Sequence, residues 1–289
     1  MLYFAFILLF LLLWSLFAAV LPRILRGLHA LANRGAGMSM RYGVVQRVVH
    51  HASRFRDYLP VILIVIAGAL LAAWAGEGFL DLAEMVHTKS TSLQKIDVRW
   101  HDWVVKERNR GATSFFTVMT MIGGPAGVIA IAAVVTIALL ITKRFRWAIY
   151  VAINVGIGSL IDAELKRYFA RARPDVAEML RRASGYSFPS GHAMGSTILF
   201  ATLSYLAIRA LPRWRWKSAA LAVGSTFIIS VALSRVYLGV HWISDVGAGI
   251  IIGLLWVTTT TVAYETARRI RMIRQLRLKS SIRDGARGA

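Results

Sequence analysis

A chain of 289 residues that is 57% hydrophobic and only 17% charged is too apolar for a soluble domain of this length, so we expect an integral membrane protein. The formal net charge of +21 would suit a nucleic-acid partner, but the basic residues gather at the ends of apolar runs, which argues against one. Cysteine is absent, which excludes disulfides, thiolate metal sites and a thiol nucleophile.

Apolar runs long enough to cross a bilayer recur along the chain. A spanning helix needs about 20 mostly apolar residues. Seven runs meet this length, at roughly 1–21, 59–76, 115–141, 147–165, 191–211, 217–237 and 243–264. The first lacks the charged start of a secretory signal and is longer than a signal's apolar region, so we expect it to be retained. The sequence predicts an all-α, polytopic membrane helical bundle.

The chain divides into three predicted parts. Residues 1–58 form an N-terminal transmembrane helix and a basic cytoplasmic linker of amphipathic, membrane-surface character. Residues 59–265 form a six-helix core, and residues 266–289 form a basic cytoplasmic tail.

Basic connections alternate with other connections along the chain. The linker, the 142–146 loop, the PRWRWK loop and the tail are strongly basic, so we expect them in the cytoplasm, against anionic lipid head groups. Residues 77–114, 166–192 and 238–242 then face the periplasm or exterior of a multi-pass protein of the inner (plasma) membrane.

Three ion-rich stretches fall on this outer side, each at the end of an apolar run. They read KRYFARARP (166–174), FPSGH (188–192) and SRVYLGVHWISD (234–245). Ionisable residues at membrane depth are costly and are usually functional. The three stretches therefore predict one site.

The third stretch offers an oriented histidine. His241 and Asp245 are four residues apart, so on a helix they share a face and can form a hydrogen bond. A carboxylate on one ring nitrogen fixes the tautomer and leaves a lone pair on the other, which suits a nucleophile or a base.

Three cations accompany this pair. Lys166 and Arg173 are seven residues apart, close to two helical turns, and can face one pocket together with Arg235. A membrane interior does not tolerate three unpaired cations, and a phosphoryl group satisfies them.

The PSGH turn supplies further donors. Ser190 donates from its hydroxyl and backbone, Gly191 permits close backbone approach, and the start of the next helix presents N–H groups to an anion. His192 then stands where a general acid is needed.

These residues resemble the signature of the type 2 phosphatidic acid phosphatase superfamily, which includes membrane lipid phosphate phosphatases and relatives of the vanadium haloperoxidases. Its pattern is Lys, six residues, Arg-Pro; then Pro-Ser-Gly-His; then Ser-Arg, five residues, His, three residues, Asp. The matching residues are Lys166, Arg173, Pro174, Pro189, Ser190, Gly191, His192, Ser234, Arg235, His241 and Asp245. The resemblance covers about residues 59–265, and residues 1–58 are additional to it.

The resemblance implies a lipid phosphate or pyrophosphate phosphatase that acts at the outer face of the membrane, on polyprenyl pyrophosphate or phosphatidic acid. His241 would attack phosphorus and form a phosphohistidine, Asp245 would orient it, and His192 would protonate the leaving group. The residues that would bind phosphoryl oxygens are Lys166, Arg173, Ser190, Gly191 and Arg235. It implies neither a metal nor a cofactor.

Two alternatives remain open. A vanadate-dependent, haloperoxidase-like oxidoreductase would use a similar pocket, but those relatives are soluble. A non-catalytic transporter or scaffold would bind anionic lipid in a basic pocket, but it would need neither histidine. The sequence selects neither the lipid nor the oligomeric state.

Overall fold

The computed structural model describes residues 58–174 and 176–285, with side chains apart from those of Val176 and residues 279–285. The predicted span at 1–21 and nearly all of the linker lie outside this part of the chain. The described residues form helices joined by short connections and contain no strand. The predicted all-α class is confirmed.

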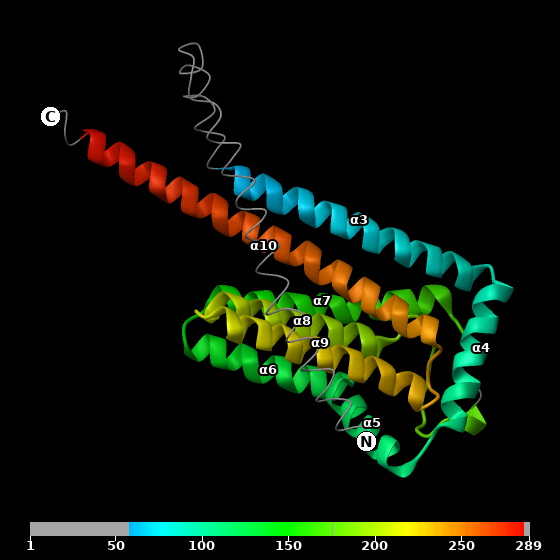
Figure 1. The fold of residues 1–289 in the computed structure, drawn as a ribbon. Coiled ribbons are helices and arrows are strands. Elements are labelled where there is room, and N and C mark those ends of the chain that lie inside the picture. Colours follow the sequence, from blue (N-terminus) through cyan, green and yellow to red (C-terminus); the bar gives the residue numbers. More distant parts are fainter. Residues whose placement is uncertain (1–57, 175, 286–289) are drawn as a thin grey trace. The chain divides into compact units, whose positions relative to one another are not determined.

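Eight α-helices and one 3₁₀ helix make up the described part of the chain (Figure 1). They are α3 (Leu59–His87), α4 (Thr91–Lys106), α5 (Arg110–Ile122), α6 (Pro125–Ile141), α7 (Phe145–Phe169), η1 (Val176–Glu178), α8 (Gly191–Ala210), α9 (Trp214–Tyr237) and α10 (Ile243–Gly285). Five of the described helices, namely α3, α7, α8, α9 and α10, are long and apolar enough to cross a membrane. The protein is therefore a multi-pass membrane protein.

The predicted run at 115–141 is a bent pair of helices rather than one straight helix. α5 ends at Ile122, α6 begins at Pro125, and their axes differ by 51°. Gly123 and Gly124 lack side chains, and Pro125 has no backbone N–H to continue the hydrogen-bond ladder of α5. Average hydropathy does not register such a break. Counted as one broken span, the pair raises the number of candidate spans in the described residues from five to six.

The chain divides into two compact units, with boundaries after Ala73 in α3 and after Val257 in α10. Trp74–Val257 forms the unit that carries the predicted site. In the other unit, Gly68 leaves room for the side chain of Val262, and the Arg277 guanidinium lies 5.2 Å from the ring centroid of Tyr58.

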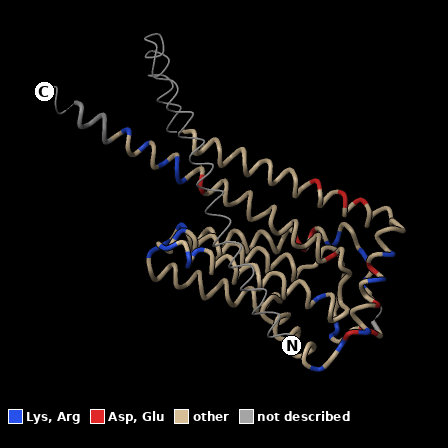
Figure 2. Tube along the Cα trace, in the orientation of Figure 1, with Lys and Arg blue, Asp and Glu red and all other residues tan. Residues whose placement is uncertain are grey.

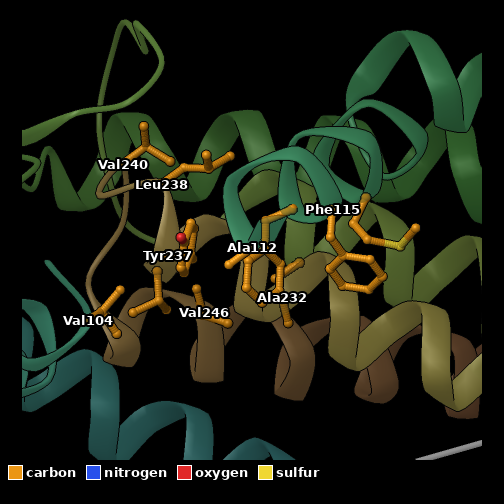
Figure 3. Packing of buried hydrophobic residues seen from close by; sticks show 12 residues of the cluster. Val104, Ala112, Phe115, Ala232, Tyr237, Leu238, Val240 and Val246 are labelled. Atoms are coloured by element: carbon orange, nitrogen blue, oxygen red, sulfur yellow. The ribbon is translucent and has the colours of Figure 1, made fainter. Parts of the chain in front are cut away.

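Apolar packing fixes the C-terminal end of α9 in the Trp74–Val257 unit (Figure 3). The rings of Phe116 on α5 and Tyr237 on α9 lie 4.6 Å apart between their centroids. The Tyr237 hydroxyl accepts a hydrogen bond from the Asn109 N–H at 2.9 Å and donates one to the Asn109 carbonyl at 3.1 Å. These contacts position the turn at 238–242, which follows α9 directly.

Charge separates the two ends of this unit (Figure 2). The α6–α7 and α8–α9 turns lie at one end and are basic, whereas α4 and the loops at 170–190 and 238–242 lie at the other. Two of the four basic connections, the α6–α7 and α8–α9 turns, thus lie together at the end opposite the loops that carry the signature stretches. That the basic end faces the cytoplasm stays a prediction.

Candidate active site

A cavity of about 790 Å³ lies at the mixed-charge end of the Trp74–Val257 unit. Its lining contains most of the residues singled out from the sequence, namely Lys166, Arg173, Gly191, His192, Arg235 and His241. Ser190 and Asp245 are fully buried beside these residues. The three signature stretches therefore meet in space, although the catalytic role of each residue stays a prediction.

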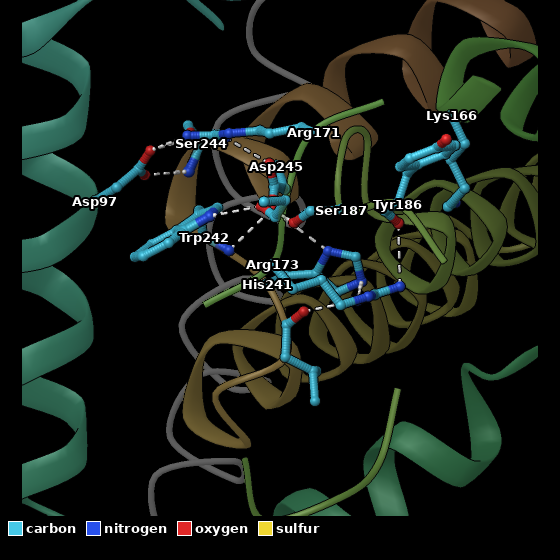
Figure 4. Close-up of polar contacts among 12 residues, drawn as sticks. Asp97, Lys166, Arg171, Arg173, Tyr186, Ser187, His241, Trp242, Ser244 and Asp245 are labelled. Carbon is cyan, nitrogen blue, oxygen red and sulfur yellow. Dashed lines mark hydrogen bonds and ion pairs between the residues drawn. The ribbon is translucent and has the colours of Figure 1, made fainter. Parts of the chain in front are cut away.

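His241 lies in the turn between α9 and α10 and is 2% exposed. The sequence-based expectation that it shares a helix with Asp245 is wrong, because α10 begins only at Ile243. His241 Nδ1 is 3.5 Å from Asp245 Oδ2, an ion-pair distance, and it makes no hydrogen bond within the described part of the chain. Nε2 lies on the other side of the ring, 3.1 Å from Arg173 Nη1 (Figure 4).

The imidazole of His241 is held in its neutral form. Burial lowers the pKa of His241 to about 4, although the neighbouring Asp245 acts in the opposite direction. At neutral pH the ring therefore carries one lone pair. If Nδ1 bears the proton and faces Asp245, that lone pair is on Nε2, at the cavity surface.

Asp245 belongs to a buried polar network behind His241, which we call the Asp245 network (Figure 4). Its members are Asp97, Arg171, Ser187, Ser244 and Asp245. Arg171 donates to Asp245 Oδ1 at 2.5 Å and to Asp97 Oδ2 at 2.6 Å. Asp245 Oδ2 accepts from Ser187 Oγ and, at 2.9 Å, from the Trp242 N–H. One guanidinium thus holds two buried carboxylates in place.

Ser244 completes the network. Its hydroxyl and its N–H both donate to Asp97, at 2.7 and 3.1 Å. Sequence reasoning missed Asp97, Arg171, Ser187 and Ser244. Arg171 and Ser244 lie within signature stretches and Ser187 lies directly before one, so their position was the available signal. Asp97 is one of several acidic residues in a mixed-charge segment, and its sequence gives no such signal.

His192 occupies the first turn of α8 and lines the cavity. A Cβ atom at Gly124, in the α5–α6 break, would lie 3.2 Å from His192 Nε2. Glycine at this position therefore leaves space beside the ring nitrogen. The bend between α5 and α6 thus places a residue without a side chain next to His192.

Lys166 and Arg173 both reach the cavity, but they do so from different elements. α7 ends at Phe169, where Ala170 adopts a left-handed conformation with φ of 43°, so Arg173 lies on a loop rather than two turns farther along a helix. Lys166 Nζ is 2.5 Å from both carboxylate oxygens of Asp162, which sequence reasoning also missed. A Cβ at Gly191 would lie 2.5 Å from Asp162 Oδ2 and 2.6 Å from Lys166 Nζ, so a side chain at this position would displace the Asp162–Lys166 pair.

Arg235 is 6% exposed and donates from Nη1 to the Thr120 hydroxyl of α5. Its Nε and the Ser190 hydroxyl are buried with no hydrogen-bond partner in the described part of the chain. Unpaired buried donors are costly. An anion with several oxygens, bound in this cavity, would satisfy both.

No group of three or more His, Cys, Asp or Glu side chains in the described residues is arranged to hold a metal ion. The carboxylates nearest the cations are already engaged, Asp162 by Lys166 and Asp245 by Arg171. The donor set is suited to an anion.

Comparison with known proteins agrees with this chemistry. Residues 145–269 match the family model described as PAP2 superfamily. Phosphatidylglycerophosphatase B of Bacillus subtilis is 28% identical over 178 residues, which are 61% of this chain and 86% of that protein. The undecaprenyl-diphosphatase of Sulfolobus acidocaldarius is 32% identical over 148 residues, which are 49% of this chain and 67% of that protein.

The fold has a solved counterpart. The crystal structure of a transmembrane PAP2 type phosphatidylglycerolphosphate phosphatase from Bacillus subtilis superposes with a TM-score of 0.63 at 25% identity, over 67% of this chain and 96% of that one. Both named relatives are phosphatases, which favours a hydrolase over the oxidoreductase and transporter alternatives. This chain therefore belongs to the PAP2 superfamily and is a membrane phosphatase, a hydrolase of phosphate esters.

Proposed function

We propose that the protein removes the terminal phosphate from lipid phosphates or diphosphates, of the polyprenyl diphosphate or phosphatidic acid type, through a phosphohistidine intermediate at the outer face of the membrane. The observation that carries this proposal is the position of His241. It lines a cavity that also contains Lys166, Arg173 and Arg235, and its Nε2 lies 3.1 Å from Arg173 Nη1.

In the first step His241 Nε2 attacks phosphorus and the bond to the leaving oxygen breaks. Arg173 Nη1, which lies 3.1 Å from Nε2, donates instead to a phosphoryl oxygen, and this frees the lone pair. The cations stabilise charge that spreads over the phosphoryl oxygens, and the N–H groups at the start of α8 add further donors.

His192 protonates the leaving oxygen in this step. The negative charge of a bound phosphate favours the imidazolium form of His192, which is the form that donates. In the second step neutral His192 accepts a proton from water, the water attacks the phosphohistidine, and inorganic phosphate leaves. Asp245 stabilises the charge on His241 while the ring nitrogen is bonded to phosphorus.

The cavity lining supports a substrate with a hydrocarbon chain. Beside the polar groups it contains apolar side chains of α5 to α8, among them Met121, Ile129, Val155, Met194 and Ile198. A lipid anchored in the membrane would meet these side chains while its phosphate meets the cations.

Trapping the intermediate tests the chemistry. Purified protein in detergent is mixed for a short time with phosphatidic acid or a prenyl diphosphate labelled with ³²P at the terminal phosphate, and then denatured in alkali. We expect label on a peptide containing His241, stable to alkali and lost in acid, and none in His241→Ala. Phosphate release with no labelled protein in any rapid-quench sample would contradict the covalent route.

Thiol labelling tests the outer location of the site. Single cysteines at Lys106 on α4 and Arg146 on α7 place a label at each end of the Trp74–Val257 unit of a chain that has no cysteine of its own. In intact cells a membrane-impermeant reagent should modify the cysteine at 106 and not the one at 146. The reverse pattern would invert the proposed topology.

A further inference from the structure

Two arginines line the cavity that no step above uses. Arg181 and Arg182 lie on the loop between η1 and α8, and both belong to the same lining as Lys166, Arg173 and Arg235. The Arg181 and Arg235 guanidiniums are close enough for their charges to repel. Neither Arg181 nor Arg182 forms an ion pair with a carboxylate of the described chain.

The loop that carries them is held on the side before the pair. Glu178, three residues before Arg181, accepts at its carbonyl from Arg108 Nη1 at 2.8 Å, and its carboxylate is 2.5 Å from His101 Nε2. The Leu180 N–H donates to the Leu238 carbonyl at 3.0 Å. Contacts with α4, with the α4–α5 connection and with the end of α9 therefore fix the approach to Arg181.

The same loop is held on the side after the pair. Arg173 donates to the carbonyls of Ser184, Gly185 and Tyr186, at 3.1, 3.0 and 3.1 Å. Ala183 and Ser184 also belong to the cavity lining. The two arginines are thus presented at the cavity between two anchored segments, rather than on a free loop.

The charges in the cavity exceed what one phosphate requires. Among the described lining residues, Asp162 is the one carboxylate beside Lys166, Arg173 and Arg235, and nearby Asp245 is already paired with Arg171. These groups leave two positive charges, which match a phosphate monoester of about two negative charges. Arg181 and Arg182 add two more guanidiniums, and guanidinium is the side chain that best matches phosphate oxygens.

We propose that Arg181 and Arg182 form a second phosphate subsite, which selects lipids with two phosphates over lipids with one. This inference rests on the proposed function and concerns the specificity of the same site. The second phosphate is either the inner phosphate of a prenyl diphosphate or the phosphodiester of phosphatidylglycerophosphate. Phosphatidic acid has no group to place there.

The subsite stabilises the departing part of a two-phosphate substrate. With a diphosphate, the bond from His241 Nε2 to the terminal phosphorus forms, the bridging P–O bond breaks, and a lipid monophosphate leaves. The two arginines hold the charge that develops on that monophosphate. With phosphatidylglycerophosphate, the leaving group is an alcohol, and the arginines hold the phosphodiester next to it.

The test is the double variant Arg181→Gln/Arg182→Gln, assayed in detergent against farnesyl diphosphate, dioleoyl phosphatidylglycerophosphate and dioleoyl phosphatidic acid. We expect kcat/KM to fall on the order of 10- to 100-fold on at least one two-phosphate lipid, and less than about 3-fold on phosphatidic acid. Loss on the diphosphate alone identifies the inner phosphate as the ligand, and loss on phosphatidylglycerophosphate alone identifies the phosphodiester. Retained activity on phosphatidic acid shows that the variant is folded.

Two controls accompany the double variant. Lys95→Gln/Arg99→Gln removes two exposed charges from α4, outside the cavity, and should leave all three activities unchanged. Arg181→Lys/Arg182→Lys should recover part of the lost activity. Equal loss on all three lipids, or no loss on any, would overturn the subsite. If the wild-type protein released phosphate from none of the three, the proposed function itself would fail.

Discussion

The two sides of His241 differ in how well their polar groups are satisfied. Behind the ring, the Asp245 network pairs its guanidinium with two carboxylates and adds two serine hydroxyls. Outside this network, Arg235 Nε on the cavity side and the nearby Ser190 hydroxyl are buried without a partner among the described residues, and His241 Nδ1 faces Asp245 at 3.5 Å without a hydrogen bond.

This difference separates a rigid support from a binding surface. A buried network in which each charge is paired holds one arrangement, and the hydrogen bond from the Trp242 N–H to Asp245 fixes the backbone next to His241. Buried donors without a partner carry a desolvation cost. A bound phosphate removes this cost by accepting their hydrogen bonds, and this contributes to the affinity for phosphate.

The largest effect is expected from His241→Ala, which removes the ring between the two sides. His241 is the one nucleophile of the proposed mechanism, so release of phosphate from both phosphatidic acid and p-nitrophenyl phosphate should be abolished. Phosphate assays on detergent-purified protein measure this, and vanadate binding shows that the cavity is intact. Substantial activity in the variant would remove His241 from the nucleophile's role.

His192→Ala changes only the cavity side, and its effect should depend on the leaving group. A lipid alcohol is a poor leaving group, so loss of the acid should lower phosphatidic acid hydrolysis on the order of 10²–10⁴-fold. Nitrophenolate leaves as a stable anion, so p-nitrophenyl phosphate hydrolysis should fall far less. The same purified variant serves for both assays, and equal losses would contradict the assignment of His192 as general acid.

Arg171→Ala breaks the supporting side and leaves two buried carboxylates without their cation. Removing one partner of a buried ion pair costs about 3–5 kcal/mol, so we expect a lower unfolding temperature in detergent together with a fall in kcat. Arg171→Lys keeps the charge but loses the two-nitrogen fork, so it should recover part of both.

The matched control is Arg167→Ala on the last turn of α7. Arg167 pairs with Glu164 at 2.5 Å, but both side chains are about 70% exposed, so this pair contributes little. Unfolding temperatures of Arg171→Ala and Arg167→Ala that coincide would show that the Asp245 network does not support the fold.

The smallest expected effect is that of a chelator, which tests whether the cavity side binds phosphate through cations of the protein alone. Excess EDTA should leave phosphate release unchanged, because the charges on the phosphoryl oxygens are met by Lys166, Arg173 and Arg235. Activity lost in EDTA and restored by added Mg²⁺ would contradict metal independence.

The fold class was predictable from sequence because the length of the apolar runs indicates spanning helices. The meeting of the three signature stretches was predictable because each lies at the end of an apolar run on the same predicted side of the membrane. The break at Gly123–Pro125 was missed because an average over an apolar window does not weigh backbone chemistry. The hydrogen bond between His241 and Asp245 was expected from helical spacing, which fails because the helix begins two residues after His241.

The Asp245 network was the least predictable part of the site. Arg171 stands two residues before Arg173, and nothing in the local sequence distinguishes an arginine that contacts carboxylates from one that lines the cavity. Asp97 is 74 residues from Arg171, in a segment where acidic and basic residues are mixed. Only the three-dimensional structure shows that Asp97, and not another acidic residue of this segment, contacts Arg171.

The chain positions in that network also bear on the order of events during synthesis. Arg171 is 74 residues from Asp97 on one side and 74 residues from Asp245 on the other. In a chain that ends before α10, Arg171 has only one of its two carboxylates, because Asp245 lies on α10. On the proposed mechanism, His241 gains the carboxylate behind it, and hydrolysis becomes possible, only after this last helix has been made.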